Sequence, residues 1–308
     1  MYNPTAHPPT LIRPTHRALG LPSTTLDHHY VFDGMTALAD FCRDHIQGKR
    51  RLQRTYSNGT TGVANDFDTF TRKLVEGDER MGNASDELLA KFEDLVPFST
   101  AWQTRNDVVG GLPNVPAFLA GHPMSMRRRV RVAKEQAPLG ILVDMTTSAG
   151  VSQDFMVKRG TLVIALVRML ALRRPITLHV TSGLAAGSPS NPDGQRSACY
   201  VTTRIETTPL DLSRAAYMLG SSDWRYWAFG LATNLGFSPE GSTTGHWTYH
   251  DHNAMRAHSR VIFDGIIPGA DEVFFISSAH LTDRDLQDPE KWLRAMLSKF
   301  GDAHVEAA

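Results

Sequence analysis

The 308-residue sequence has little cysteine, no net charge and no long apolar run. Its two cysteines, Cys42 and Cys199, cannot build a disulfide framework, and no CxxC pair is present to hold zinc. Lysine plus arginine and aspartate plus glutamate both total 32, which argues against a general nucleic-acid coat or a membrane-surface protein. The longest apolar run, residues 161–172, contains Arg168 and is too short to span a bilayer. We therefore expect a protein without a membrane segment, in a reducing, cytoplasmic compartment.

The signatures of common enzyme classes are also absent from the sequence. It contains no GxxxxGK[ST] phosphate loop, no GxGxxG after the first core strand, no GxSxG elbow and no HExxH. Ser148, His179 and Asp144 can be drawn as a catalytic triad, but a triad is recognised by its geometry and not by spacing. We therefore expect a non-enzymatic protein.

Three regions of the chain differ in their residue pattern. Residues 1–30 are rich in proline and lack periodicity, which predicts an irregular N-terminal segment. Residues 31–122 are expected to be mostly helical, with amphipathic helices following Asp33 and Ser85. Residues 123–308 alternate apolar strands with helices, which predicts an α/β domain whose parallel or mixed sheet is flanked by helices.

Within the expected α/β domain, the strands and helices are short and distinct. The alternation of apolar and basic residues in 124–134 predicts an edge strand, and residues 140–145 predict a buried parallel strand. A long apolar helix at 155–174 and a strand at 176–180 follow. Further strands are expected at 199–205, 260–263 and 272–276, and further helices at 210–219, 224–235 and 288–300.

A D-x-T-x-S motif follows the buried strand at 140–145. Asp144, Thr146 and Ser148 present one carboxylate and two hydroxyls at alternate positions, and Mg²⁺ favours such oxygen ligands. Ligands of an open α/β sheet bind at the carboxyl ends of its strands, where this motif lies. The alternative is that these side chains only cap the following helix.

In this motif the chain resembles the von Willebrand factor A-like family, which carries D-x-[ST]-x-S at the end of its first strand. The resemblance covers that strand, the long helix and the next strand, and it implies a Rossmann-like fold. It also implies a divalent cation such as Mg²⁺, whose open coordination position a partner's carboxylate completes. Thr207 or Thr208 would supply a further hydroxyl ligand and Asp264 a second carboxylate.

A narrower resemblance involves residues 107–124 and the segments around 210–213 and 224–229. They are similar to an uncharacterised family of von Willebrand A-like proteins found in phages and mobile elements. By that analogy, the partner is an AAA+ ATPase or a second copy of the chain. The protein would then be found in the host cytoplasm or in the virion.

Two other clusters suggest different functions. His246, His250 and His252 lie within seven residues and suggest a transition-metal site, or else a polar loop. The basic residues of 127–131 suggest phosphate contacts, or else a solvated surface. These basic residues are Arg127, Arg128, Arg129 and Arg131.

The sequence as a whole favours a non-enzymatic protein-interaction module that binds a partner carboxylate through a divalent cation. The first alternative is a phage virion or assembly component that uses the fold as a scaffold. The second is a nucleic-acid-associated protein, and the third is a metal-dependent hydrolase built on the histidine cluster.

Overall fold

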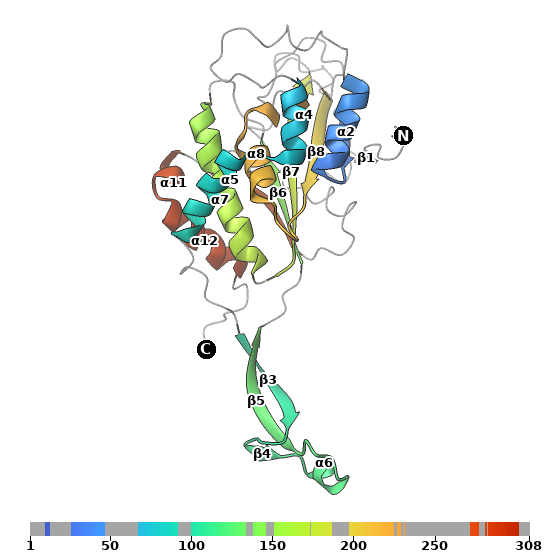
Figure 1. The fold of residues 1–308 in the computed structure, drawn as a ribbon, viewed down its shortest axis with the longest axis vertical. Coiled ribbons are helices and arrows are strands. Elements are labelled where there is room, and N and C mark those ends of the chain that lie inside the picture. Colours follow the sequence, from blue (N-terminus) through green and yellow to red (C-terminus); the bar gives the residue numbers. More distant parts are fainter. Residues whose placement is uncertain are drawn as a thin grey trace.

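The structure is a computed structural model of the 308-residue chain, in which an α/β body carries a projecting β-arm (Figure 1). It describes residues 10–12, 26–46, 67–91, 100–133, 138–145, 151–172, 174–186, 197–224, 227–228, 231, 272–276, 281 and 283–301.

Within the described residues, the central sheet of the body has six strands in the order β1–β2–β8–β7–β6–β9. They are β1 (Thr10–Ile12), β2 (Leu26–Phe32), β6 (Leu139–Asp144), β7 (Ile176–Ala186), β8 (Ser197–Ile205) and β9 (Glu272–Ile276). β7, β6 and β9 run parallel, β8 is antiparallel to β7, β2 is parallel to β8, and β1 is antiparallel to β2. This mixed sheet confirms the expected α/β class. The strand predicted at 260–263 lies outside the described residues.

The helices of the body share one hydrophobic core with a single face of this sheet. They are α2 (Met35–Ile46), α4 (Phe67–Glu76), α5 (Glu79–Ala90), α7 (Gln153–Ala171), α8 (Leu212–Gly220), α11 (Asp283–Gln287) and α12 (Pro289–Gly301). Ile141 and Val143 of β6 belong to the core, whereas Leu142 between them is buried on the other face. Both faces of β6 are therefore buried, as its unbroken apolar sequence predicts.

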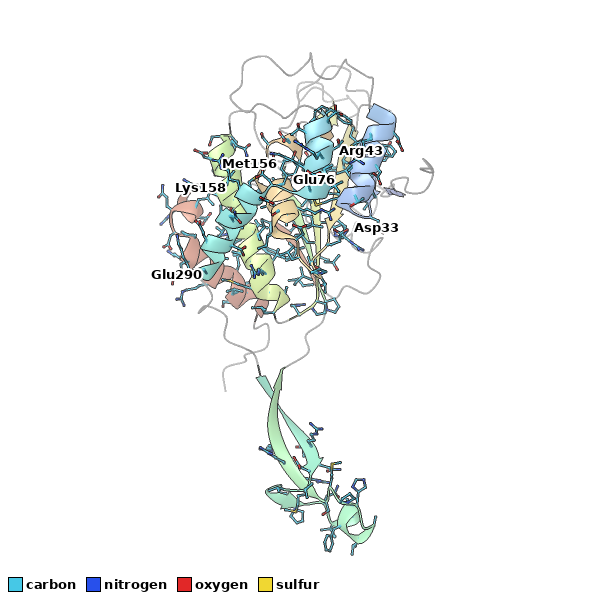
Figure 2. All side chains as sticks on the ribbon, viewed as in Figure 1. Asp33, Arg43, Glu76, Met156, Lys158 and Glu290 are labelled. Carbon is cyan, nitrogen blue, oxygen red and sulfur yellow. The ribbon has the colours of Figure 1, made fainter. Side chains whose placement is uncertain are left out.

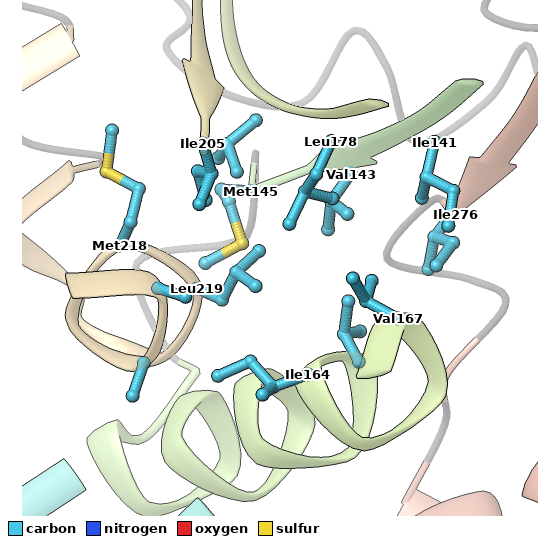
Figure 3. Close-up of a cluster of buried hydrophobic side chains, with 14 of the residues drawn as sticks. Ile141, Val143, Met145, Ile164, Val167, Leu178, Ile205, Met218, Leu219 and Ile276 are labelled. Atoms are coloured by element: carbon cyan, nitrogen blue, oxygen red, sulfur yellow. The ribbon is translucent and has the colours of Figure 1, made fainter. Parts of the chain in front are cut away.

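The longest helix, α7, packs directly on the sheet. Ser152 caps its first turn by accepting a hydrogen bond from the backbone N–H of Phe155 at 3.3 Å. Figure 3 shows Ile164 and Val167 of α7 facing the side chains of β6 and β7. At Gly160 the helix meets the end of α8 so closely that a Cβ atom would lie 2.5 Å from the Leu219 carbonyl oxygen. Glycine is therefore required where α7 and α8 cross.

The start of one predicted helix is corrected. α4 is followed by Gly77, whose left-handed φ of 83° leads into α5. The next helix begins at Glu79 and not after Ser85, because Asp78 accepts a hydrogen bond from the Met81 backbone N–H at 3.4 Å and caps it. Ser85 lies inside α5 and donates to the Met81 carbonyl oxygen.

The aromatic run of the predicted helix at 224–235 contributes to the core. Trp224 and Trp227 are buried, and Trp227 stacks on Phe70 with ring centroids 5.4 Å apart. Cys42 is also buried, and burial raises the pKa of its thiol. Among the described residues, no helix has the length and hydrophobicity needed to cross a membrane.

Residues 100–133 form the β-arm, which lies outside the central sheet (Figure 1). It consists of β3 (Thr100–Asp107), β4 (Leu112–Pro113), α6 (Val115–Leu119) and β5 (Met126–Ala133). β5 pairs antiparallel with β3 along its whole length, and β4 pairs with the first two residues of β5. Figure 1 shows the β-arm extending away from the body, with α6 at its far end.

The β-arm and the N-terminal strands alter the expected division of the chain. Residues 126–133 form a strand, but this strand pairs with β3 and not with the central sheet. The expected boundary between residues 122 and 123 therefore lies inside the β-arm. At the N-terminus, β1 and β2 fall mostly within 1–30, which was expected to be irregular, and they belong to the central sheet. Local patterns identify a strand, whereas its partner depends on contacts distant in sequence.

Candidate functional site

Asp144 occupies the carboxyl end of the strand predicted to carry the D-x-T-x-S motif. It is the last residue of β6, is only 1 % exposed, and pairs in register with Thr181 of β7. Thr146 and Ser148 follow it but lie outside the described residues. Asp264 and the three histidines of the 246–252 cluster also lie outside them.

The loop after α8 meets the same edge of the sheet. Gln153, the first residue of α7, donates from Nε2 to the Gly220 carbonyl oxygen at 2.8 Å and accepts from the Ser222 backbone N–H at 3.1 Å. These two bonds hold the segment 221–223 beside the start of α7. Because α7 begins where β6 has ended, this segment lies near the carboxyl end of β6.

The 221–223 segment consists of three buried polar residues, Ser221, Ser222 and Asp223. The Tyr217 hydroxyl donates to Asp223 Oδ2 at 2.7 Å, and Ser221 Oγ accepts from the Asp223 backbone N–H. Sequence reasoning missed this segment, although three polar residues directly after a predicted apolar helix were a visible signal. It places a buried carboxylate, Asp223, near the start of α7.

A buried arginine lies directly beneath the D-x-T-x-S motif. Arg159 of α7 is 1 % exposed and donates from Nη2 to the Asp144 carbonyl oxygen at 2.7 Å. Its Nη1 lies 3.7 Å from the Met145 sulfur. A positive charge in this position repels a divalent cation held by Asp144. The described residues therefore fit a bound cation only in part.

The threonines expected to complete the cation site lie at the opposite edge of the sheet. Thr207 donates its hydroxyl to the Ile176 carbonyl oxygen at 2.6 Å, and Ile176 is the first residue of β7. Asp144 pairs with Thr181, five residues further along β7, which corresponds to about 16 Å. The assignment of Thr207 or Thr208 as a ligand beside Asp144 is therefore wrong. The cause is that β8 runs antiparallel to β7, so its carboxyl end points away from Asp144.

On the second face of the sheet, buried polar groups form a row that ends at Asp144. Thr202 of β8 donates its hydroxyl to Thr181 Oγ1 at 2.9 Å and is bonded to His29 Nε2 of β2 at 2.7 Å. Hydrogen bonding compensates the burial of these polar groups.

His179 lies on this same face, two residues before Thr181 on β7. Its side chain is 1 % exposed. Burial, followed by the positive charge of Arg204, lowers the pKa of His179 to about 3. A general base in a catalytic triad needs a pKa near the operating pH, so His179 lacks the basicity for that role.

The tip of the β-arm carries most of the exposed apolar side chains in the described part of the chain. Seven of the nine large apolar residues recorded as exposed lie between residues 108 and 124, and each is 45–78 % exposed. This tip patch consists of Val108, Val109, Leu112, Val115, Phe118, Leu119 and Met124. None of the described side chains from 104 to 129 is buried. Figure 2 shows the side chains of the β-arm on all sides of its ribbon, clear of the body.

The tip nevertheless has a defined backbone. The Asn114 backbone N–H donates to the Ser125 carbonyl oxygen at 2.7 Å, and the Asn114 carbonyl oxygen accepts from Phe118 as α6 begins. At Gly110, a Cβ atom would lie 2.3 Å from the Arg127 carbonyl oxygen, so only glycine fits there. Backbone contacts therefore hold the exposed apolar side chains in place.

The basic residues predicted to contact phosphate lie along β5 of the β-arm. Arg127, Arg128 and Arg129 are exposed, and the side chain of Arg131 lies outside the described residues. Arg128 is 3.9 Å from Asp107 in a solvent-exposed pair. Among the described residues, no group of three or more histidine, cysteine, aspartate or glutamate side chains is arranged to hold a metal ion.

Comparison with known proteins gives one match. A family model described as "Domain of unknown function (DUF7192)" matches residues 22–301. No curated protein and no solved structure matches the chain.

Proposed function

The chain belongs to the DUF7192 family, and we propose that it is a non-enzymatic protein-interaction protein that binds its partner through the β-arm. The observation that carries this proposal is the tip patch, an apolar surface held away from the body. Monomeric proteins rarely expose contiguous apolar patches of this kind unless they bind something there. Burying one such side chain contributes about 1.5–3 kcal/mol. The remainder of the chain serves as a scaffold, as in the assembly-component alternative.

Site-specific crosslinking in cells that express the protein tests this proposal. A photo-crosslinking amino acid replaces Phe118 at the tip or, as a control, Leu172 at the end of α7. Both residues are exposed apolar residues, at 69 % and 60 %. We expect one defined protein adduct from position 118 and none from position 172. Equal adduct patterns from the two positions, or none from either, would refute the proposal.

A finer part of the proposal is the von Willebrand A-like character of the body. The support is the order of elements, in which β6 ends at Asp144 and is followed by α7 and the parallel strand β7. In that fold Asp144, with Thr146 and Ser148, would hold a divalent cation, which would supply an open coordination position for a partner carboxylate. The charge of Arg159, which is bonded to the Asp144 carbonyl oxygen, opposes the cation.

Direct titration of the purified protein with Mg²⁺ or Mn²⁺ tests the cation separately from the β-arm. We expect binding by the wild type, loss of binding in Asp144→Asn and tighter binding in Arg159→Gln, which removes the opposing charge. Asp154→Asn is a matched control, because this exposed carboxylate lies in the first turn of α7. Identical titrations of wild type and Asp144→Asn would eliminate the cation and leave the β-arm proposal standing.

A further inference from the structure

The neutral total charge of the chain conceals two regions of opposite sign. The β-arm, residues 100–133, contains five arginines and one aspartate, which gives it a net charge of +4. Because basic and acidic residues both total 32 in the whole chain, the remaining residues carry a net charge of −4. The apolar tip patch is thus presented on a positively charged element.

Much of the opposite charge lies in two helical segments of the body. Residues 33–46 and 67–91, which include α2, α4 and α5, contain nine acidic and five basic side chains. We call these two segments the acidic layer. Four of its carboxylates are exposed and form no ion pair within the described part of the chain. They are Asp44, Asp68, Glu79 and Glu87.

The acidic layer also carries an apolar contact point. Val75 of α4 is 37 % exposed, and it is the one large apolar residue recorded as exposed among the described side chains of this layer. Asp68 lies two turns before Val75 on the same side of α4, and the exposed Arg72, one turn before it, pairs with Glu76 at 3.9 Å. The exposed carboxylates of the acidic layer complement a tip patch bordered by arginines.

From this complementarity we infer that the β-arm of one copy docks on the acidic layer of a second copy. The inference rests on the proposed function and names its partner. The β-arm does not lie against the acidic layer of its own chain, since Figure 1 shows it projecting away from the body, with α2 and α4 at the opposite end. The contact joins two different surfaces, so it is heterologous and builds rings or filaments.

Sedimentation velocity of the purified full chain tests the inference. We expect the weight-average mass to rise with protein concentration and to fall with added salt, because the contact combines apolar burial with exposed charge. A mass that stays monomeric at every concentration and salt level would overturn the inference.

Variants of each surface show whether these two regions make the contact. Phe118→Ser with Leu119→Ser removes the centre of the tip patch, and Glu76→Lys with Glu79→Lys reverses charge on the acidic layer. We expect each double variant to associate about tenfold or more weakly than the wild type. Leu172→Ser, which removes an exposed apolar side chain elsewhere, is expected to associate normally. Equal association of all variants would exclude the two surfaces.

A mixing experiment tests the head-to-tail arrangement itself. One double variant keeps an intact acidic layer and the other an intact β-arm, so an equal mixture contains one functional contact. We expect the mixture to form a dimer and nothing larger, although each variant alone is monomeric. Absence of the mixed dimer would contradict docking between copies. Unfolding midpoints equal to that of the wild type verify that the variants fold.

The crosslinking experiment separates failure of this inference from failure of the proposed function. If position 118 crosslinks to another protein while the purified chain stays monomeric, the second-copy inference is wrong and the interaction function stands. Polynucleotide binding that Arg127→Glu with Arg129→Glu abolishes, again with a monomeric chain, would favour the nucleic-acid alternative and overturn the inference.

Discussion

The body and the β-arm use apolar residues in opposite ways. In the body, β6 is buried on both faces and α7 lies between the sheet and α5, so apolar side chains specify the fold. In the β-arm, no described side chain from 104 to 129 is buried, and the shape depends on strand pairing and backbone hydrogen bonds. The apolar residues of the tip patch contribute little to folding, and this is why we propose that they bind a partner.

This difference in burial predicts different responses to the same type of substitution. The following expectations are ordered from the largest to the smallest effect on the free energy of unfolding. Together they test whether substitutions in the body lower the free energy of unfolding more than substitutions in the β-arm do.

Truncation of the core at Ile164 is expected to have the largest effect. Ile164 is 1 % exposed where α7 faces the sheet, so Ile164→Ala loses apolar contact and leaves a cavity. We expect a loss of about 2–5 kcal/mol in urea unfolding. Leu172→Ala at the exposed end of α7 is the control, with a change within about 0.5 kcal/mol. Similar losses from the two variants would contradict the assigned core.

Replacement of the buried arginine is expected to have the next largest effect. Arg159→Met removes a charged donor and leaves the Asp144 carbonyl oxygen without this bond, which we expect to lower the unfolding free energy by about 1.5–3 kcal/mol. Arg168→Met on the same helix breaks an exposed pair with Asp86 and should cost less than about 1 kcal/mol. Chemical denaturation of both variants compares them. A larger loss from Arg168→Met would reverse the expectation.

The buried histidine should make the body sensitive to acid. The pKa of His179 is about 3 in the folded state, compared with about 6.5 in the unfolded chain. Between these two pH values His179 binds a proton in the unfolded chain but not in the folded chain. The full stabilisation from neutral His179 is present above about pH 6.5. Below that pH the free energy of unfolding falls by about 1.4 kcal/mol for each pH unit, down to about pH 3.

Denaturation between pH 7 and pH 5 measures this slope. His179→Gln should flatten it, whereas His122→Gln, which replaces an exposed histidine of the β-arm, is the matched control. An unchanged slope in His179→Gln would show that another group causes the acid sensitivity.

The smallest effect is expected at the tip of the β-arm. Phe118→Ser removes a large apolar side chain that is 69 % exposed in the folded chain. We expect the unfolding free energy to change by no more than about 0.5 kcal/mol, because little apolar area is transferred from water at this position on folding. A loss comparable to that of Ile164→Ala would mean that the tip packs against the body.

The sequence predicted those elements whose local pattern reflects burial. The unbroken apolar run at 140–145 became β6, and the long apolar helix became α7, because each is surrounded by the core. The tryptophans at 224 and 227 lie in the core, where aromatic side chains bury a large apolar area.

What the sequence did not predict depends on long-range pairing. β5 was recognised as a strand but assigned to the wrong sheet, because alternation does not identify the partner strand. Thr207 was assigned to the wrong edge, since only the antiparallel direction of β8 shows where it ends. Arg159 lies fifteen residues after Asp144, and its contact there follows from the way α7 turns back over β6.

The β-arm begins and ends at one point of the body. Thr100 and Ala133 are register partners across β3 and β5, so their Cα atoms are about 5 Å apart. A short turn or a different hairpin can therefore replace the whole segment without moving the strands of the central sheet. Under the proposed function, the residues that specify binding and the residues that specify the fold lie in separate stretches of the chain, so mutation can change the first while the second stays intact.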